Sequence, residues 1–439
     1  MRGNEASTLP IHLLSYAIEH PQPAFCSFTV IVPASIVDLL YHHAMHAHQA
    51  HVQAYGFAKG TVPVAYIANT YQTSLQEHIK EFLFKYFVLS YLLYEIMRQK
   101  QLVVGDPRLS TIECEPGKDA QFKFELSLFE SLPLSEWKYF PFKAPKRKNY
   151  KDLDRQVEGF LAQEKSQYDA EQRHDQIAVG DWVYFSVGLV DRNEQPIFEE
   201  PSNFWLKIGD EEADKLFHEV FLQKKIGQRI ISTNKSLQDS LSGQLDLNYR
   251  FLVEIKDILK NSYFCLELFK NYFKLKTNKE INQKLIEVFS YRNDISQRRA
   301  TVEEALALLF SKHRFEVPHY LALRQQKAVL DAIVTNPDYH VYRMQKDFKE
   351  RVKELAEKQI REQILVDHIT YDQGLTVAHA DIKAYLNMYK RARMKEFIYF
   401  DPPTSKQRGQ EVPVNTAEMA RACLREKAIN HVIYHLTKK

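Results

Sequence analysis

The chain has 439 residues, of which 45% are hydrophobic and 26% are charged, and its 59 Lys and Arg nearly balance its 56 Asp and Glu. The length predicts two to four domains, and the composition is typical of a globular protein and excludes a disordered one. The even charge balance argues against a protein that coats nucleic acid, and four widely separated cysteines without a CxxC pair argue against a zinc site or a disulfide framework.

The first part of the chain predicts a compact α+β unit. Its predicted elements are one strand, two helices and two further strands, at residues 26–32, 35–53, 63–100, 110–113 and 121–129. The strands are indicated by β-branched and aromatic residues with alternating polarity, and the helices by apolar residues that recur every three or four positions. The turn Gly56–Pro63 joins the two helices, so this order places it at the far tip of the unit.

A basic, proline-containing segment, Lys143–Lys148, separates this unit from the next. A helix is predicted after it, at 152–167. From 177 to 258, alternating strands and five of the 13 glycines predict a β domain with one short helix at 211–221. Beyond 259 the chain is almost free of glycine and predicts an all-α region, with helices at 302–310, 318–332, 337–370, 381–397 and 416–436.

The turn at the tip has an unusual composition. Two glycines enclose one large aromatic residue and one cation, Phe57 and Lys59. Glycine adopts backbone conformations that other residues avoid, so a tight turn here directs both side chains into solvent. The segment Gly56–Pro63 resembles the ribosome-docking loop of bacterial trigger factor, Gly-Phe-Arg-Lys-Gly-Lys-x-Pro, with Ala58 in place of the Arg and Thr61 in place of the second Lys.

The order of an α+β tip, a β domain and a helical domain is also that of trigger factor, and the resemblance covers roughly residues 26–437. Leu132-Pro133-Leu134 resembles the link out of the first domain, and Phe315–Pro318 the start of the arm helix. The resemblance implies a multidomain α+β fold with four parts: a ribosome-binding-type α+β domain at 1–143, a basic linker and helix at 144–176, an FKBP-like prolyl isomerase-type domain at 177–258, and an all-α client-binding domain with helical arms at 259–439. It implies ribosome-binding residues Gly56, Phe57, Lys59 and Gly60.

The β domain resembles an FKBP-type prolyl isomerase, and the resemblance implies an aromatic pocket that includes Phe198, Phe217 and Phe251. Such a pocket would accelerate X-Pro rotation by desolvating and twisting the bond. Asp214 and Leu216 stand where the family has an Ile and a Gly, and a buried carboxylate must be paired or neutralised. We therefore expect an altered pocket, which leaves it open whether the chain is an active peptidyl-prolyl cis-trans isomerase.

Other site types have weaker support. Five histidines crowd the first predicted helix, and His42 and His46 are spaced to share a helix face. No acidic residue lies between these two, and no second cluster completes a metal site, so we interpret them as a solvated face and expect no metal. No phosphate-binding loop or catalytic elbow is present, so we expect no cofactor and no ATPase. The apolar run Phe82–Met97 is shorter than a membrane span and contains Lys85 and Glu95, so it predicts a buried helix. We therefore expect no membrane contact and a cytoplasmic protein.

The sequence thus predicts an ATP-independent chaperone that resembles trigger factor and holds unfolded or nascent polypeptides on its helical arms. It would dock at the ribosome exit tunnel through Gly56–Pro63, with rRNA contact at that loop. Loss of the Arg predicts weaker docking, because a guanidinium binds phosphate with two hydrogen bonds. Two alternatives remain open. One is an active prolyl isomerase with auxiliary peptide-binding domains, and the other is a ribosome-independent interaction protein with a dedicated partner.

Overall fold

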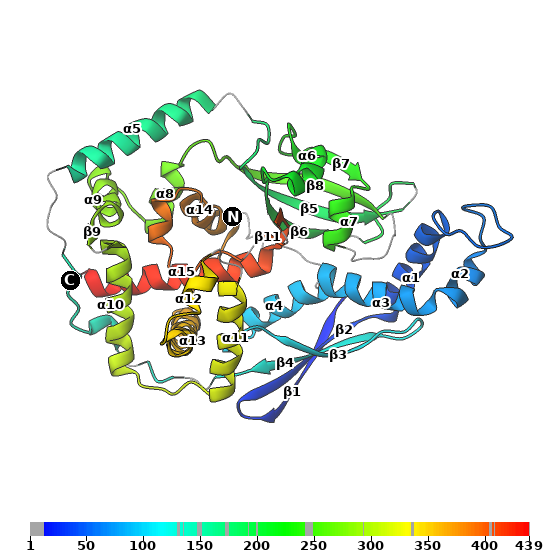
Figure 1. Cartoon of the computed structure of the whole chain (residues 1–439), viewed down its shortest axis with the longest axis horizontal. Coiled ribbons are helices and arrows are strands. Elements are labelled where there is room, and N and C mark those ends of the chain that lie inside the picture. The colour runs from blue at the N-terminus through cyan, green and yellow to red at the C-terminus, as the bar shows by residue number, and fades with distance from the viewer. Residues whose placement is uncertain are drawn as a thin grey trace, which may run out of the picture.

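The structure, a computed structural model, describes residues 13–129, 132–134, 136–146, 152–171, 175–191, 193–198, 201–241, 249–292, 294–334, 338–403, 406–407 and 409–438. It is a multidomain α+β protein, as predicted. An N-terminal α+β unit ends in a narrow tip, a β-sheet unit packs beside it, and a helical region forms the opposite end (Figure 1). The domain boundaries expected at residues 143, 176 and 258 stay predictions, because one hydrophobic core includes residues from both the first unit and the β unit.

The N-terminal unit contains a four-stranded antiparallel sheet in the order β1-β2-β4-β3. The strands are β1 Ser15–Gln22, β2 Phe25–Val32, β3 Arg108–Glu113 and β4 Ala120–Ser127. Phe28 lies opposite Phe124, and both are buried. Since side chains alternate across a strand, the residues at every second position on β2 and β4 form one apolar face that packs on the helices. The edge strand β1 was not predicted.

The helices of this unit are α1 Ala34–Gln49, α2 Val64–Thr70, α3 Gln72–Leu83, the π-helix η1 Phe84–Val88 and α4 Leu89–Arg98. The single long helix expected from 63 to 100 is therefore divided. It breaks at Tyr71, whose φ of −109° and ψ of 18° are not helical, and it widens at η1. Three of the five η1 residues are aromatic, and two of these rings contact different units. The Phe84 ring lies 6.3 Å from Phe124 in the sheet, and the Phe87 ring lies 5.0 Å from Phe198 in the β unit.

The β unit is a five-stranded sheet in the order β13-β6-β5-β8-β7, and its neighbouring strands are antiparallel. Its elements are β5 Trp182–Val190, β6 Ser202–Lys207, the 3-10 turn η3 Glu212–Asp214, α6 Lys215–Phe221, β7 Arg229–Ser232, α7 Lys235–Leu241 and β8 Arg250–Leu259. The short helix expected at 211–221 is present as η3 and α6, whereas α7 was not predicted. The fifth strand, β13 Val414–Asn415, comes from the C-terminal part of the chain.

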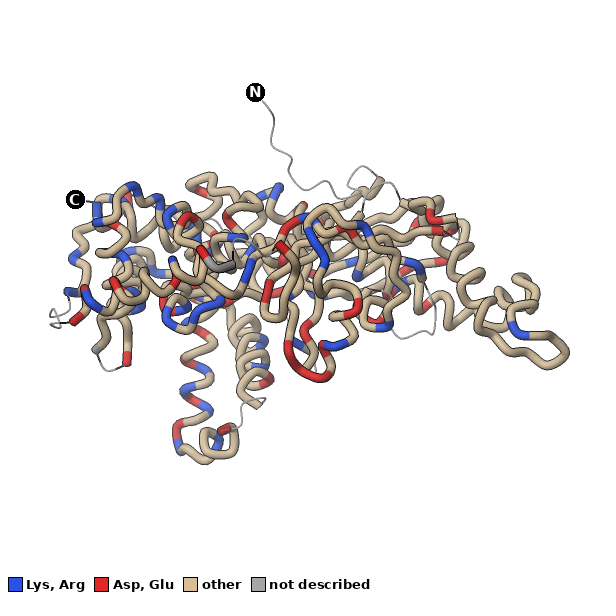
Figure 2. The backbone as a smooth tube through the Cα atoms, turned by 90° about the horizontal axis from the view of Figure 1, so that it is seen from above, with Lys and Arg blue, Asp and Glu red and all other residues tan. Residues whose placement is uncertain are grey.

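The helical region holds α5 Leu153–Glu171, α8 Leu266–Phe273, α9 Asn278–Phe289, the short strands β9 Tyr291–Arg292 and β10 Ile295–Ser296, α10 Gln297–Lys312, α11 His319–Val334, α12 Tyr339–Tyr342, α13 Phe348–Asp372, α14 His379–Tyr389, the 3-10 turn η4 Met394–Phe397, β11 Lys406–Gln407, β12 Gln410–Glu411 and α15 Thr416–Thr437. The expected start of the longest helix at Pro337 lies outside the described residues, and α13 itself starts at Phe348. Helices α11 and α13, the second of which is seen end-on in Figure 1, project from the body as an arm in Figure 2. No helix within the described ranges is long and apolar enough to cross a membrane.

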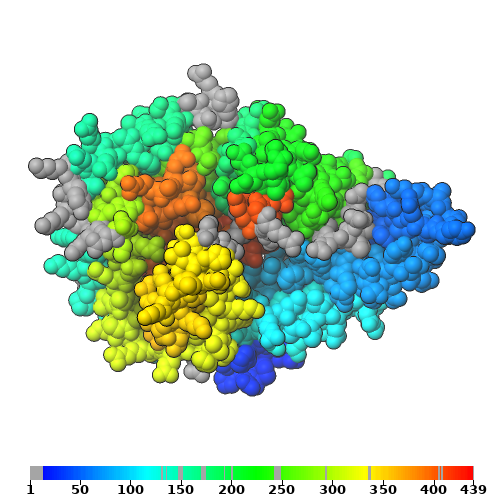
Figure 3. Space-filling model, in the orientation of Figure 1, coloured from blue at the N-terminus to red at the C-terminus, as the bar shows by residue number. Residues whose placement is uncertain are grey.

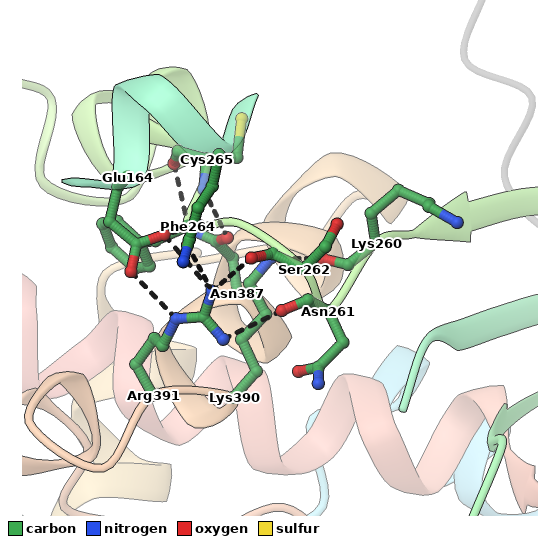
Figure 4. A network of polar contacts seen from close by, with 10 residues as sticks. Glu164, Lys260, Asn261, Ser262, Phe264, Cys265, Asn387, Lys390 and Arg391 are labelled. Carbon is green, nitrogen blue, oxygen red and sulfur yellow. Dashed lines mark hydrogen bonds and ion pairs between the residues drawn. The ribbon is translucent and has the colours of Figure 1, made fainter. Parts of the chain in front are cut away.

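The β unit is joined to its neighbours by polar contacts as well as by apolar packing. At its junction with the helical region, the Arg391 guanidinium binds the Glu164 carboxylate of α5, with Nε 3.0 Å from Oε1 (Figure 4). The same guanidinium donates to the backbone carbonyls of Asn261 and Ser262, at 2.8 and 2.9 Å. The Asn387 side-chain amide accepts a hydrogen bond from the Cys265 N–H and donates one to the Cys265 carbonyl, each at 3.0 Å. The segment that leaves β8 is therefore fixed to α5 and to the end of α14.

Candidate docking loop and isomerase-type pocket

The loop between α1 and α2 is formed by two consecutive turns. The Phe57 N–H donates to the Ala54 carbonyl and the Thr61 N–H to the Ala58 carbonyl, each at 3.1 Å. Gly56 and Gly60 have φ values of +86° and +82°, in the left-handed region that other residues rarely adopt. Both glycines are thus required by the backbone, and the two turns present residues 57 to 59 at the outermost point of the unit.

Three aromatic side chains surround this point. Tyr55 is fully exposed, and Phe57 and Tyr66 are 42% and 41% exposed. The rings of Phe57 and Tyr66 lie 5.9 Å apart in a tilted arrangement, so an aromatic pair forms on the solvent side of the loop. Lys59 is also exposed. The sequence predicted Phe57 and Lys59, whereas Tyr55 and Tyr66 were missed.

The loop is anchored from below by one buried residue. The Val62 side chain is fully buried, and its carbonyl accepts a hydrogen bond of 2.7 Å from the Gln49 side chain at the end of α1. This contact ties the second turn to the helix that precedes the loop. The aromatic residues and Lys59 are therefore presented on a supported turn.

The tip is almost uncharged. Between Asp38 and Glu77, Lys59 is the only Lys, Arg, Asp or Glu, although such residues make up 26% of the chain. In Figure 2 the tip accordingly carries a single blue segment and no red one. A surface with one cation and several aromatic rings favours an apolar contact with one added electrostatic contact over a field of many phosphate contacts.

The histidines of α1 do not form a metal cluster. The Nε2 atoms of His42 and His46 are 3.2 Å apart, but no group of three or more metal-ligating side chains lies within the part of the chain that the structure describes. Burial and the nearby His42 lower the pKa of His43, with Asp191 of the β unit acting in the opposite direction. The expected solvated face is thus partly covered, because His43, His46 and His48 are half-buried.

The three aromatic residues expected in an isomerase pocket are buried. Phe198, Phe217 and Phe251 are 7%, 2% and 0% exposed and belong to one apolar core. Phe198 packs edge-to-face on Phe87 of η1, whereas Phe217 packs against Phe221 with ring centres 6.4 Å apart. The structure thus brings these residues into the same core and surrounds them with other side chains.

The carboxylate of Asp214, which was expected to need pairing, is 1% exposed and is indeed paired. It accepts the Glu211 N–H at 3.2 Å and, from a distant part of the chain, the Glu411 N–H at 2.7 Å. Hydrogen bonds of this kind stabilise a charged carboxylate away from water. A Cβ at Gly209 would lie 1.9 Å from Asp214 Oδ2 and 2.9 Å from Glu411 Cγ, so the glycine makes room for both residues.

The arm exposes apolar side chains beyond its own small core. Val329, Val352 and Ala356 form that core between α11 and α13. Around it and towards the end of the arm lie exposed apolar side chains, namely Leu323, Val334, Val341, Tyr342, Met344 and Leu355. Val341 and Met344 are the most exposed of these, at 65% and 80%. Exposed apolar surface of this kind is typical of a binding site for other polypeptides.

Comparison with known proteins relates the first domain to one family. The family model described as "Bacterial trigger factor protein (TF)" matches residues 15–160. The trigger factor of Rickettsia prowazekii (strain Madrid E) is 25% identical over 215 residues, which cover 47% of this chain and 46% of that protein. The trigger factor of Rickettsia massiliae (strain Mtu5) is 24% identical over 214 residues, with the same coverage. The match thus spans slightly less than half the length of these relatives.

A solved structure described as "Promiscuous Substrate Recognition in Folding and Assembly Activities of the Trigger Factor Chaperone" aligns with 96% of this chain and 100% of that chain, at 13% identity and a TM-score of 0.35. The family relationship itself rests on the sequence matches. On these matches, residues 15–160 of the chain form a domain of the trigger factor type, with an identity to these relatives of 24–25%.

Proposed function

We propose that this chain is an ATP-independent holding chaperone that docks beside the ribosomal exit tunnel through the Gly56–Pro63 loop and holds emerging polypeptides on its helical arm. The observation that carries the proposal is the exposed aromatic and cationic tip on two glycine-bounded turns, at the position of the docking loop in the family that the first domain matches. The cytoplasm is the compartment that this role implies.

The composition of the tip defines how it would bind. Phe57 and Tyr66 offer an apolar ridge, and Lys59 offers one ammonium group to an rRNA phosphate or to an acidic side chain. Each phosphate neutralised by a cation contributes about one to the slope of log affinity against log salt. With Ala58 in place of an arginine, we expect a slope of about one and binding that depends mainly on Phe57.

The arm would supply the client-binding surface. Its exposed apolar residues need no nucleotide to bind an unfolded segment, because burial of apolar surface stabilises such contacts by about 25 cal/mol per Å². Charged residues along α13 alternate with the apolar ones and keep the arm hydrated (Figure 2). A surface of this kind binds many sequences weakly, as a holding chaperone requires.

Co-sedimentation with 70S ribosomes tests the docking proposal. The double variant Phe57→Ala Lys59→Ala should pellet at least about tenfold less at low salt, since it removes the aromatic anchor and the only cation of the tip. The matched control is Lys138→Ala Tyr139→Ala, which removes a lysine and a 75% exposed tyrosine in η2 Trp137–Tyr139, a turn that packs on α15. Equal pelleting of the docking variant, the control and the unaltered protein would refute docking through this loop.

The isomerase alternative has its own test. The burial of Phe198, Phe217 and Phe251 supports a β unit without prolyl isomerase activity. In a protease-coupled assay of X-Pro peptides, the intact chain should leave the uncatalysed rate unchanged. Acceleration would favour the isomerase alternative. Failure to suppress the aggregation of several unrelated unfolded proteins would instead favour a dedicated partner.

A further inference from the structure

A segment from near the C-terminus covers the face of the β unit beside Phe217. We call residues 409–415 the strap; it contains β12 and β13. In antiparallel register, Val414 lies opposite Trp205 and Asn415 opposite Phe204, so β13 covers the edge of β6. In Figure 3 the orange-red atoms of this part of the chain lie directly against the green β unit. The edge that an added peptide strand would use is thus already paired.

One side chain of the strap bridges two helical elements of the β unit. The Gln410 amide donates to the Ala213 carbonyl in η3 at 2.9 Å and to the Ser236 hydroxyl in α7 at 2.8 Å. Asn234, just before α7, donates to the Leu216 carbonyl at 2.7 Å. The two Gln410 contacts place the strap beside η3, the turn that directly precedes α6 and Phe217.

The backbone of the strap is bound as closely as its side chains. The Glu411 N–H donates to the buried Asp214 carboxylate at 2.7 Å, and Thr416, directly after the strap, donates from its hydroxyl to the Asn203 carbonyl at 2.9 Å. Gly209 lacks the Cβ that would collide with Asp214 and Glu411. The β unit therefore supplies an acceptor, a strand edge and a gap that together fit one extended peptide backbone.

We propose that the strap is a built-in peptide ligand of the β unit and occupies the face that would otherwise bind an extended, proline-containing peptide. The strap has the chemistry of such a ligand, because it is extended, pairs as a strand and contains the X-Pro sequence Val412-Pro413 between Glu411 and Val414. Strand addition relies on backbone hydrogen bonds to a sheet edge, and the pairing of β13 with β6 and the bond from the Glu411 N–H to Asp214 are of this kind. Release of the strap would expose a site for unfolded segments with a proline between small apolar residues.

The test uses the full chain and two release variants. Gln410→Ala Thr416→Val removes the bridge and the hydroxyl that donates to Asn203, and Glu411→Pro removes the N–H that binds Asp214. Both variants keep the Asp214 carboxylate available to a bound peptide. Gln325→Ala is the control, because it deletes a similar amide on the arm, where Gln325 bonds Gln359 at 2.8 Å. Hydrogen exchange of the strap and β6 amides reports release. Fluorescence anisotropy of a labelled peptide, Gly-Gln-Glu-Val-Pro-Val-Asn, reports binding at the vacated face.

We expect faster exchange in the strap and peptide affinity at least about tenfold above that of the unaltered chain and the Gln325→Ala control. Faster exchange without a gain in affinity would show that the vacated face does not bind the peptide, and would overturn the proposal. Unchanged exchange in both release variants would show that these contacts do not hold the strap, and would overturn it as well. Ribosome pelleting of the same variants depends on the α1–α2 loop and not on the strap. The docking proposal can therefore fail or succeed independently of the strap proposal.

Discussion

Replacement of Arg391 by alanine tests how firmly the β unit is fixed to the helical region. Arg391 joins three segments, since its guanidinium binds the Glu164 carboxylate and the carbonyls of Asn261 and Ser262 (Figure 4). Alanine removes all of these donors. The substitution leaves the Glu164 carboxylate 4% exposed, with a hydrogen bond of 2.5 Å from the Phe264 N–H.

The expected loss follows from the burial of the pair. Removing one partner of a buried ion pair costs about 3–5 kcal/mol, because the other charge stays buried without compensation. The Arg391 side chain is 23% exposed, so water reaches part of the vacated space and the lower end applies. We therefore expect the free energy of unfolding to fall by about 3 kcal/mol. Adding Glu164→Gln removes the stranded charge and should restore about 1–2 kcal/mol of that loss.

Urea unfolding followed by tryptophan fluorescence measures this change. Two of the three tryptophans, Trp182 and Trp205, lie in the same apolar core as Phe264 and report on the joint. Lys118→Ala is the control, since it breaks an exposed ion pair of 2.8 Å with Glu115 and should leave the free energy of unfolding almost unchanged. A loss below about 1 kcal/mol for Arg391→Ala, or strictly additive effects in the double variant, would refute the buried-pair argument.

Two further predictions concern pH and client binding. Burial, with the charges of His48 and Lys85, lowers the pKa of His78 to about 4. The pKa of histidine in the unfolded chain is about 6.5. The neutral form of His78 therefore stabilises the fold above pH 6.5, and this contribution is lost as the pH falls towards 4. Between pH 7.5 and 5 the unaltered chain should therefore lose about 2 kcal/mol more stability than His78→Gln in urea unfolding, and equal losses would show that His78 is not the responsible group. On the arm, Val341→Ser Met344→Ser removes two strongly exposed apolar side chains and should reduce suppression of aggregation by at least about twofold in a light-scattering assay, whereas an unchanged effect would place client binding elsewhere.

The sequence predicted those elements whose signals are local. The turn at Gly56–Pro63 and the helix α1 follow from glycines, prolines and helical periodicity, and the structure confirms them. The long helix expected from 337 to 370 is confirmed only from Phe348 on, because Tyr339–Tyr342 form the separate short helix α12. It did not predict β1, because the strand is largely exposed and its apolar alternation is weak. It also missed β13, whose two residues become a strand only because Trp205 and Phe204 lie opposite them.

The candidate sites were predicted unevenly for similar reasons. Phe57 and Lys59 lie between the glycines that define the turn, so their exposure follows from local conformation. The exposure of Tyr66 depends on how α2 packs, which periodicity over seven residues does not determine. The stretch between Asp38 and Glu77, in which Lys59 is the only Lys, Arg, Asp or Glu, was a sequence signal that could have identified the whole tip as one surface.

The position of the β unit bears on which part of the chain can act on clients. His78 Nε2 and the Tyr249 hydroxyl, 2.8 Å apart, fix it to the N-terminal helices, and Lys383 of α14 binds Asp257 of β8 at 2.7 Å. The strap covers a third side through Glu411. Because the β unit is held by contacts on three sides, it loses little further conformational entropy when a client binds to the arm. The surfaces of the β unit that make these contacts are not available to a client. We infer that, while the strap is bound, client contact falls to the arm and the β unit holds the arm and the docking tip at a fixed separation.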